Sequence, residues 1–285
     1  MNGLALCSGI GGLELALRMA AGVRTVCHVE RDSFAASVLV ARMAEAALDQ
    51  APIWDDLSTF DASAWRGCVD IVSAGFPCQP FSVAGKQRGT DDERHLWPHV
   101  ARIIRESGAS LAFLENVPGL VGLGITEVLG DLAEMGFDAE WGCLSASEVG
   151  APHGRERIFI LAYANGEGEQ QSKGCLADLW GRTRDGGEDV GDADLARLEG
   201  RLVRKGERAD ERPAWPPGPE DSDGWAKWIE RRGSSPVLCR GVDEPAAWLD
   251  RADRLRCLGN AVVPAQAAAA FRLLVGRVMK SQNLS

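Results

Sequence analysis

Short apolar runs alternate with longer amphipathic stretches throughout residues 1–163, and this rhythm limits the possible folds more than any other feature of the sequence. Four apolar runs each precede a polar or glycine-rich turn, at Leu4–Cys7, Thr25–Val29, Val69–Ala74 and Leu111–Leu114. Apolar residues at helical spacing predict helices at Leu13–Ala21, Ser33–Ala47, Leu96–Arg105 and Ile125–Met135, with Asp32 and Thr126 as caps. Strands and helices in this order typically form a parallel sheet with helices on both faces. The sequence therefore predicts an α/β fold.

The amino-acid composition of the chain changes at residue 166. The segment 166–250 holds 13 of the 33 glycines, 6 of the 13 prolines and five of the nine tryptophans, which predicts a small, loop-rich module. Its basic run from Arg197 to Arg212 is interleaved with glutamates, so it fits a solvated helix face as well as a phosphate-binding surface. A helical pattern returns after Arg251. We therefore expect one domain made of residues 1–165 and 251–285, interrupted by the module 166–250.

Composition bears on partners and location. The net charge of −10 argues against a nucleic-acid partner unless the basic residues are confined to one cleft. The eight cysteines form no Cys-x-x-Cys pair and only four histidines accompany them, so no metal site is expected. The start Met1–Leu4 lacks the basic region of a signal peptide, and no apolar run reaches membrane-spanning length. We expect a cytoplasmic monomer without membrane contact.

The segment from Leu4 to Leu15 reads as a strand, a glycine-rich turn and a helix start, in which glycines allow the backbone to approach a ligand closely. Glu30 ends the next strand 21 residues after Gly9, where a carboxylate can bind both hydroxyls of a ribose. Asp56 follows a third apolar step and can accept from an adenine amino group. Ordinary surface carboxylates are the alternative. Because no Gly-Lys-Ser/Thr sequence is present, the pattern favours a nucleoside without a triphosphate.

Cys78 lies just beyond a buried strand, in a turn that Gly75, Pro77 and Pro80 constrain. A nucleophilic thiolate must be held exposed against its electrophile, and this position meets that need. The polar segment from Val83 to Arg94 reads either as a loop that closes over substrate or as an ordinary connection.

The sequence Gly75-Phe76-Pro77-Cys78-Gln79-Pro80-Phe81-Ser82 resembles the catalytic motif of the cytosine-C5 DNA methyltransferases of prokaryotic and phage type. Three further motifs of that family have counterparts in the same order, at Glu115-Asn116-Val117, Gly154-Arg155-Glu156-Arg157-Ile158-Phe159 and Gly259-Asn260-Ala261-Val262-Val263-Pro264. The resemblance covers residues 4–163 and about 251–275. The module between them lies where the family keeps its target-recognition domain.

This resemblance implies a Rossmann-like class I methyltransferase domain that binds S-adenosylmethionine. The implied cofactor-binding residues are Cys7, Ser8, Gly9, Ile10, Gly11, Gly12, Glu30, Asp56, Pro77, Leu96 and Asn260. The chain departs from the family at Cys7, where an aromatic residue is usual, and at His153, where glutamine is usual. The first departure leaves open a donor that carries a group larger than methyl.

The resemblance also implies the chemistry. Cys78 would attack carbon 6 of a cytosine flipped out of duplex DNA, while Glu115, Arg157 and Arg155 stabilise the charge that develops. The implied DNA-binding residues are Gln79, Ser82, Lys86, Gln87 and Arg88. Relatives of this kind belong to restriction-modification systems, but the recognised sequence and any partner nuclease stay open.

Other functions fit part of the pattern. A related branch of the family methylates transfer RNA, but the Cys-Phe-Thr insertion associated with it is absent. A non-catalytic DNA-binding relic would not need the full set of catalytic residues. An oxidoreductase that binds a dinucleotide at the glycine-rich turn would leave Cys78, Glu115 and Arg157 without a joint role.

Overall fold

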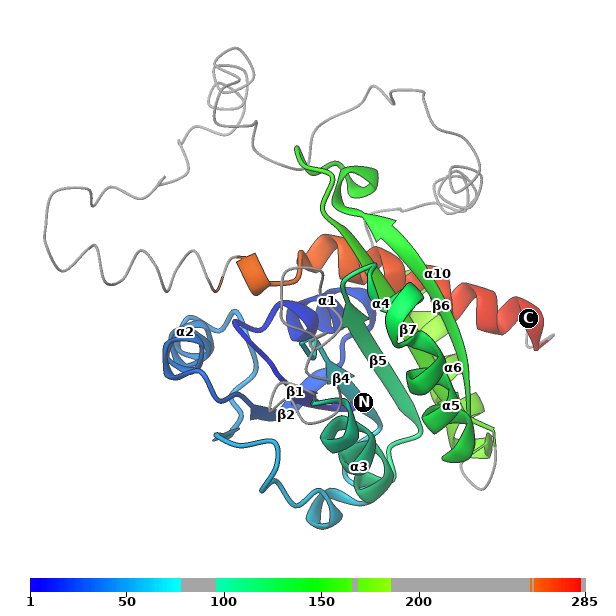
Figure 1. Cartoon of the computed structure of the whole chain (residues 1–285), viewed down its shortest axis with the longest axis horizontal. Coiled ribbons are helices and arrows are strands. Elements are labelled where there is room, and N and C mark those ends of the chain that lie inside the picture. The colour runs from blue at the N-terminus through cyan, green and yellow to red at the C-terminus, as the bar shows by residue number, and fades with distance from the viewer. Residues whose placement is uncertain (78–95, 166–168, 186–256, 258, 283–285) are drawn as a thin grey trace, which may run out of the picture. The chain divides into compact units, whose positions relative to one another are not determined.

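The computed structural model describes residues 1–77, 96–165, 169–185, 257 and 259–282, drawn in colour in Figure 1. The chain divides into two compact units. The larger comprises Met1–Leu144, Glu156–Gly187 and Ala261–Ser285, and the smaller comprises Ser145–Arg155 and Glu188–Asn260. The predicted division into a domain of residues 1–165 and 251–285 and a module of residues 166–250 stays a prediction. That the module recognises a target stays a prediction.

Seven strands form one sheet in the order β3-β2-β1-β4-β5-β7-β6. Their bounds are β1 Asn2–Leu6, β2 Arg24–Val29, β3 Ile53–Trp54, β4 Ile71–Ala74, β5 Leu111–Asn116, β6 Phe137–Ser145 and β7 Glu156–Ala164. The predicted parallel pairing is confirmed from β3 through β5. It is wrong for β7, which pairs antiparallel with β5. Only residues 146–155 separate β6 from β7, too few for the helical crossover that a parallel neighbour needs, so the chain turns back.

The predicted helices are present in the described residues. The helices are α1 Gly12–Ala21, α2 Ser33–Ala44, α3 Trp97–Ser107, α4 Leu120–Leu123, α5 Ile125–Glu134, α6 Glu169–Asp185 and α10 Pro264–Ser281, with 3-10 turns η1 Ser63–Trp65 and η3 Ala146–Val149. Asp32 caps α2 as predicted, because its side chain accepts from two backbone amides of the first turn. The prediction of Thr126 as a cap is wrong, because α5 begins at Ile125 after Gly124.

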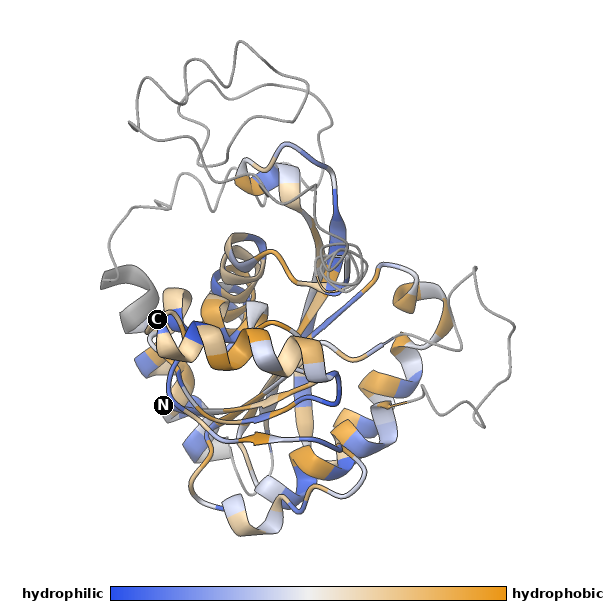
Figure 2. Cartoon of the chain, turned by 90° about the vertical axis from the view of Figure 1, so that its left-hand side faces the viewer, coloured by the Kyte–Doolittle hydropathy of each residue, from blue (hydrophilic) through white to orange (hydrophobic). Residues whose placement is uncertain are grey.

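The two faces of the sheet are covered by different helices, as the residues of β5 make clear. Ala112 and Leu114 belong to a core cluster that also contains buried residues of α3 and α5. Phe113 points to the other face, where its ring stacks on Phe159 at 5.8 Å and meets Phe271 of α10 edge-on at 5.1 Å. Figure 2 shows the hydrophobic colouring concentrated along the strands and on the helix faces turned toward them. The sheet is therefore the buried middle layer of the larger unit.

None of the helices in the described part of the chain is long and apolar enough to cross a lipid bilayer.

Candidate active site

The predicted site residues follow one another along the carboxyl edge of the sheet (Figure 1). Asp56 comes after β3, Glu30 after β2 and the glycine-rich loop Cys7–Gly12 after β1. Pro77 comes after β4, and Glu115 lies near the end of β5. Because these strands are parallel neighbours, their carboxyl ends meet at one edge. The fold thus places along one edge of the sheet residues that 60 or more positions separate in the sequence, such as Glu30 and Glu115.

The glycine-rich loop adopts backbone conformations that suit glycine. Gly9 and Gly11 have φ of 53° and 83°, and Cys7 also has positive φ, at 49°. The amide of Gly11 donates to the Ser8 carbonyl at 2.8 Å, and the Ile10 carbonyl accepts from Arg42 Nη1 at 2.5 Å. These contacts hold the loop in a tight turn at the start of α1.

Gly12 allows the C-terminal motif to approach this loop. A Cβ atom at position 12 would lie 2.7 Å from the carbonyl oxygen of Val262, which is closer than a carbon atom can come. The first and last motifs of the chain therefore meet at a backbone contact that only glycine permits.

The carboxylate of Glu30 is directed onto the glycine-rich loop. One oxygen accepts from the amide of Gly9 at 2.6 Å, and the other accepts from the amide of Asp32 at 2.7 Å. Asp56 uses Oδ1 to accept from the amide and the hydroxyl of Ser58, both at 2.8 Å, and these hydrogen bonds hold its pKa below the usual value. Both carboxylates are thus oriented by short hydrogen bonds.

The surroundings of the loop are acidic. The half-buried thiol of Cys7 has its pKa raised to about 12, first by burial and then by the negative charges of Glu30 and Glu14. An uncharged thiol in an acidic environment suits a cationic ligand such as the sulfonium of S-adenosylmethionine better than a phosphate. The residues present therefore fit this cofactor.

Glu14 is a buried carboxyl group near Cys7 and Glu30 that the sequence analysis did not single out. It is only 3% exposed, and its Oε1 accepts from the Ser73 hydroxyl of β4 at 2.9 Å. Its Oε2 is buried and has no hydrogen-bond partner in the part of the chain that the structure describes. Burial is the main reason that its pKa is raised to about 7, and Glu30 adds to the effect. The only sequence signal was an acidic residue among the apolar residues of the first helical turn.

At the other end of the edge, Glu115 and Arg157 form an ion pair. Glu115 Oε1 lies 2.8 Å from Arg157 Nε, and the side chains are 9% and 15% exposed. A Cβ atom on Gly75 would lie 3.3 Å from Glu115 Oε2, so the carboxylate lies against the segment that leads to Cys78. Asn116 Nδ2 donates to the Phe76 carbonyl at 3.0 Å and holds that segment to β5. Three of the predicted motifs meet here.

Several predicted site residues are not part of this geometry. Cys78, Gln79, Ser82, Lys86, Gln87 and Arg88 lie outside the described residues. Arg155 and Asn260 belong to the smaller unit, in which Arg155 Nη2 donates to the Gly259 carbonyl at 2.7 Å and so connects two of the motifs. Pro77 is exposed, and Leu96 is half-buried directly before α3. Their proposed contacts with ligands stay predictions.

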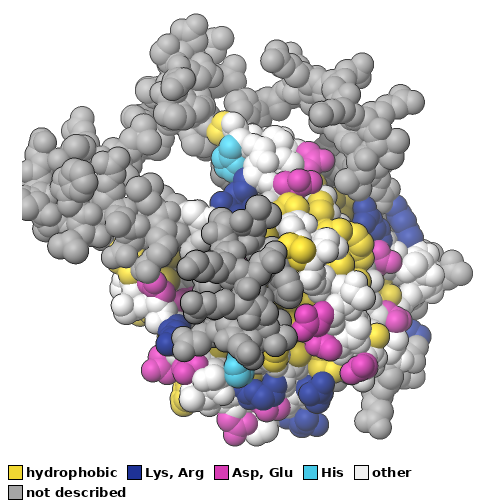
Figure 3. Space-filling model, viewed as in Figure 1, with side chains coloured by type: hydrophobic (Ala, Val, Ile, Leu, Met, Phe, Trp, Pro, Cys, Tyr) yellow, Lys and Arg dark blue, Asp and Glu magenta, His cyan; other side chains and the backbone are white. Residues whose placement is uncertain are grey.

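Charged side chains of both signs are mixed on the described surface in Figure 3. Lys and Arg side chains there lie among Asp and Glu rather than in one continuous basic patch of the coloured residues. The coloured residues in this view therefore form no continuous basic surface for binding phosphates.

Comparisons with known proteins agree with the geometry. A family model described as C-5 cytosine-specific DNA methylase matches residues 1–183. The type II methyltransferase M.NgoMIV of Neisseria gonorrhoeae is 32% identical over 170 residues, which are 57% of this chain and 51% of that protein. M.HhaI of Haemophilus parahaemolyticus is 32% identical over 165 residues, 56% of this chain and 48% of that protein. The matches thus span about half the length of these relatives.

A solved structure extends the likeness of the fold to nearly the whole chain. The Entamoeba histolytica methyltransferase EhMeth superposes with a TM-score of 0.59 over 98% of each chain, at 15% identity. The family match covers more than half of the chain and includes the glycine-rich loop, the Cys78 motif and the Glu115–Arg157 pair. This chain therefore belongs to the C-5 cytosine-specific DNA methylase family.

Proposed function

We propose that the chain is a DNA cytosine-C5 methyltransferase that uses S-adenosylmethionine. The observation that carries the proposal is the ion pair between Glu115 and Arg157, in which the Glu115 carboxylate lies against Gly75, three residues before Cys78. A carboxylate and a guanidinium beside the segment that leads to a cysteine supply the groups needed to add a nucleophile to a pyrimidine. The type II methyltransferases among the relatives support the same activity.

Carbon 5 of cytosine is a poor nucleophile until carbon 6 carries a bond to an electron-rich atom. The thiolate of Cys78 forms that bond, and the ring electrons move toward carbon 5. Glu115 hydrogen-bonds N3 and the amino edge of the base, and Arg157 neutralises charge at the O2 side. After transfer, a base removes the proton from carbon 5 and the Cys78 sulfur leaves. Arg157 also holds the Glu115 carboxylate in place before the base arrives.

S-adenosylmethionine supplies an electrophilic methyl group from its sulfonium when it is bound. Glu30 would hold its ribose hydroxyls and Asp56 its adenine amino group, while the loop Cys7–Gly12 lies against the methionine part.

The substrate and setting are part of the proposal. The target base is stacked in a duplex, so it must be flipped out at a cost of a few kcal/mol. Gln79, Ser82, Lys86, Gln87 and Arg88 would contact the emptied space and the phosphates, and the module 166–250 would recognise the sequence. We further propose that the enzyme acts as a cytoplasmic monomer in a restriction-modification system.

Trapping with modified DNA tests this function. With the donor present, duplex DNA that contains 5-fluorocytosine should form a covalent adduct, because fluorine at carbon 5 cannot leave as a proton does. Cys78→Ala should form no adduct and transfer no methyl group, yet it should still bind S-adenosylmethionine in calorimetry. An adduct with fluorinated transfer RNA but not with DNA would reassign the substrate. A Cys78→Ala protein with normal turnover would contradict the mechanism.

A further inference from the structure

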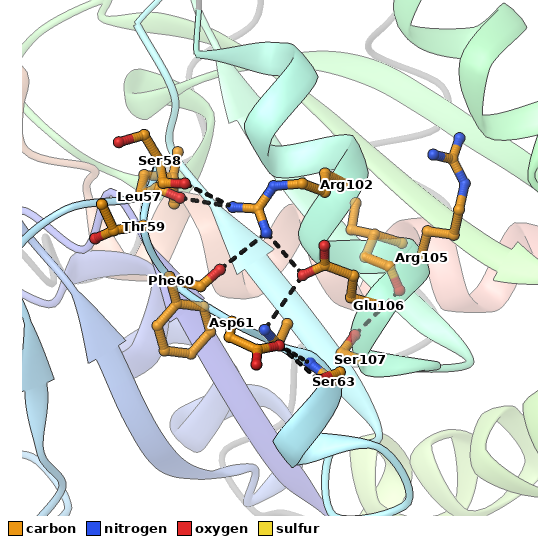
Figure 4. A network of polar contacts seen from close by, with 12 residues as sticks. Leu57, Ser58, Thr59, Phe60, Asp61, Ser63, Arg102, Arg105, Glu106 and Ser107 are labelled. Atoms are coloured by element: carbon orange, nitrogen blue, oxygen red, sulfur yellow. Dashed lines mark hydrogen bonds and ion pairs between the residues drawn. The ribbon is translucent and has the colours of Figure 1, made fainter.

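Arg102 of α3 makes several hydrogen bonds with the loop that follows β3 (Figure 4). Its Nη2 donates to the carbonyl of Leu57 at 2.9 Å, and its Nη1 donates to the carbonyl of Phe60 at 2.9 Å. Nη1 also pairs with Glu106 Oε2 at 2.7 Å, four residues along the helix. Both ends of the guanidinium fork therefore hold main-chain carbonyls of one loop.

Glu106 extends the same network. The oxygen that pairs with Arg102 also accepts from the amide of Ala62 at 3.2 Å. The Arg66 side chain donates to the carbonyls of Arg105 and Glu106, both at 3.3 Å. The loop from Leu57 to Ala62 is thus fixed to α3 at carbonyls near its start and at an amide near its end.

The sheet alone does not fix this loop. β3 is only two residues long and lies at the edge of the sheet, and no helix or strand occurs between Trp54 and η1. Asp56, directly before Leu57, has Oδ1 bound to Ser58. Its Oδ2 has no hydrogen bond to any part of the described chain and can accept from a ligand. The direction in which Oδ2 points therefore depends on the backbone that Arg102 holds.

We propose that Arg102 is a positioning residue for adenine recognition, because its guanidinium fixes the loop that presents Asp56. The inference rests on the proposed function, in which Asp56 accepts from the adenine amino group. Lysine cannot replace arginine here, since an ammonium lacks the planar fork that reaches Leu57 and Phe60 together. Loss of Arg102 should therefore lower the binding selectivity for adenine over a base without the amino group.

The test is a binding comparison between S-adenosylhomocysteine and S-inosylhomocysteine, in which oxygen replaces the amino group of the adenine. The parent protein should prefer the adenosine compound about tenfold in calorimetry, which is the effect of one hydrogen bond to a charged group. Arg102→Met and Arg102→Lys should both bring this preference close to one. Arg105→Met is the matched control, because Arg105 is an exposed arginine on the same helix whose side chain points away from the loop, and it should keep the parent preference.

A thermodynamic cycle separates positioning from general stability. Asp56→Ala should lose the preference, and Arg102→Met with Asp56→Ala should lose no more than Asp56→Ala does. Thermal melting followed by circular dichroism establishes that each variant is folded. If Arg102→Met does not fold, the milder change Arg102→Lys takes its place in the test. An unchanged preference in the folded Arg102 variants, or equal binding of both compounds by the parent, would overturn the inference. A parent that binds neither compound would instead contradict the proposed function.

Discussion

Two buried carboxyl groups, Glu115 and Glu14, lie in different regions of the sheet edge, and their charged surroundings differ. At the β5–β7 end, Glu115 faces the guanidinium of Arg157 at 2.8 Å. In the first turn of α1, Glu14 accepts a hydrogen bond from one hydroxyl, and its second oxygen has no hydrogen-bond partner among the described residues. The carboxylate assigned to the base has a counter-charge, whereas no cationic side chain of the described residues pairs with Glu14.

This difference predicts which change, the loss of a partner or a change of pH, each region responds to. A buried ion pair keeps both groups charged but depends on both partners. A buried carboxyl group without a counter-charge is held partly neutral instead, and this is why the pKa of Glu14 is raised to about 7. The first region should therefore be sensitive to the loss of one partner, and the second should be sensitive to pH.

Removal of the guanidinium is the most severe test of this comparison. Arg157→Met should lower the free energy of unfolding by about 3–5 kcal/mol, because it leaves the Glu115 carboxylate buried without its ion-pair partner. Denaturation in urea at pH 8 measures the loss. Glu115→Gln in the same protein is the control and should recover part of the stability. A loss below about 1 kcal/mol would place this pair among exposed ion pairs of little consequence.

Removal of the charge from Glu14 should change the free energy of unfolding by a somewhat smaller amount, and it should stabilise the protein at high pH. Its folded-state pKa of about 7 lies above the ordinary 4.5, so its contribution to stability is complete below pH 4.5 and is lost as pH rises through 7. The free energy of unfolding of Glu14→Gln relative to the parent should therefore rise by about 3 kcal/mol between pH 4.5 and pH 8. Urea denaturation at both pH values measures this difference.

A second buried group makes the control for Glu14 necessary. Burial lowers the pKa of His28 to about 4 from its ordinary 6.5. Its contribution is therefore present above pH 6.5 and is lost as pH falls through 4, opposite to that of Glu14. Only the difference between Glu14→Gln and the parent isolates the carboxyl group. A difference that does not change with pH would mean that Glu14 has an ordinary pKa.

The smallest of the three effects on the free energy of unfolding concerns the glycine-rich loop Cys7–Gly12. Gly12→Ala should destabilise the protein by about 1–3 kcal/mol, because the new methyl group would meet the Val262 carbonyl at 2.7 Å. Gly130→Ala in α5 is the matched helical control, since a Cβ there has nothing within 4 Å, and it should stabilise by about 1 kcal/mol. Equal effects in thermal melts would show that the contact with Val262 does not constrain the loop.

Much of the fold could be predicted from local patterns. The strands β1, β2, β4 and β5 and the helices α1, α2, α3 and α5 were predicted, because their apolar spacing is set by residues close in sequence. The antiparallel direction of β7 was not, since strand direction depends on which neighbours the chain reaches. The loop Cys7–Gly12 and the pair of Glu115 and Arg157 were predicted as site residues, while Glu14 and Arg102 were not.

The sequence by itself determined the family and the order of the motifs, because both are properties of short runs of residues. Only the tertiary structure decided which buried charges have partners. Glu14 meets Ser73 across 59 residues and Arg102 meets Leu57 across 45, and no local pattern signals either contact. Burial and pairing arise when distant segments pack together, and they set the pKa of Glu14 and the conformation of the loop that carries Asp56.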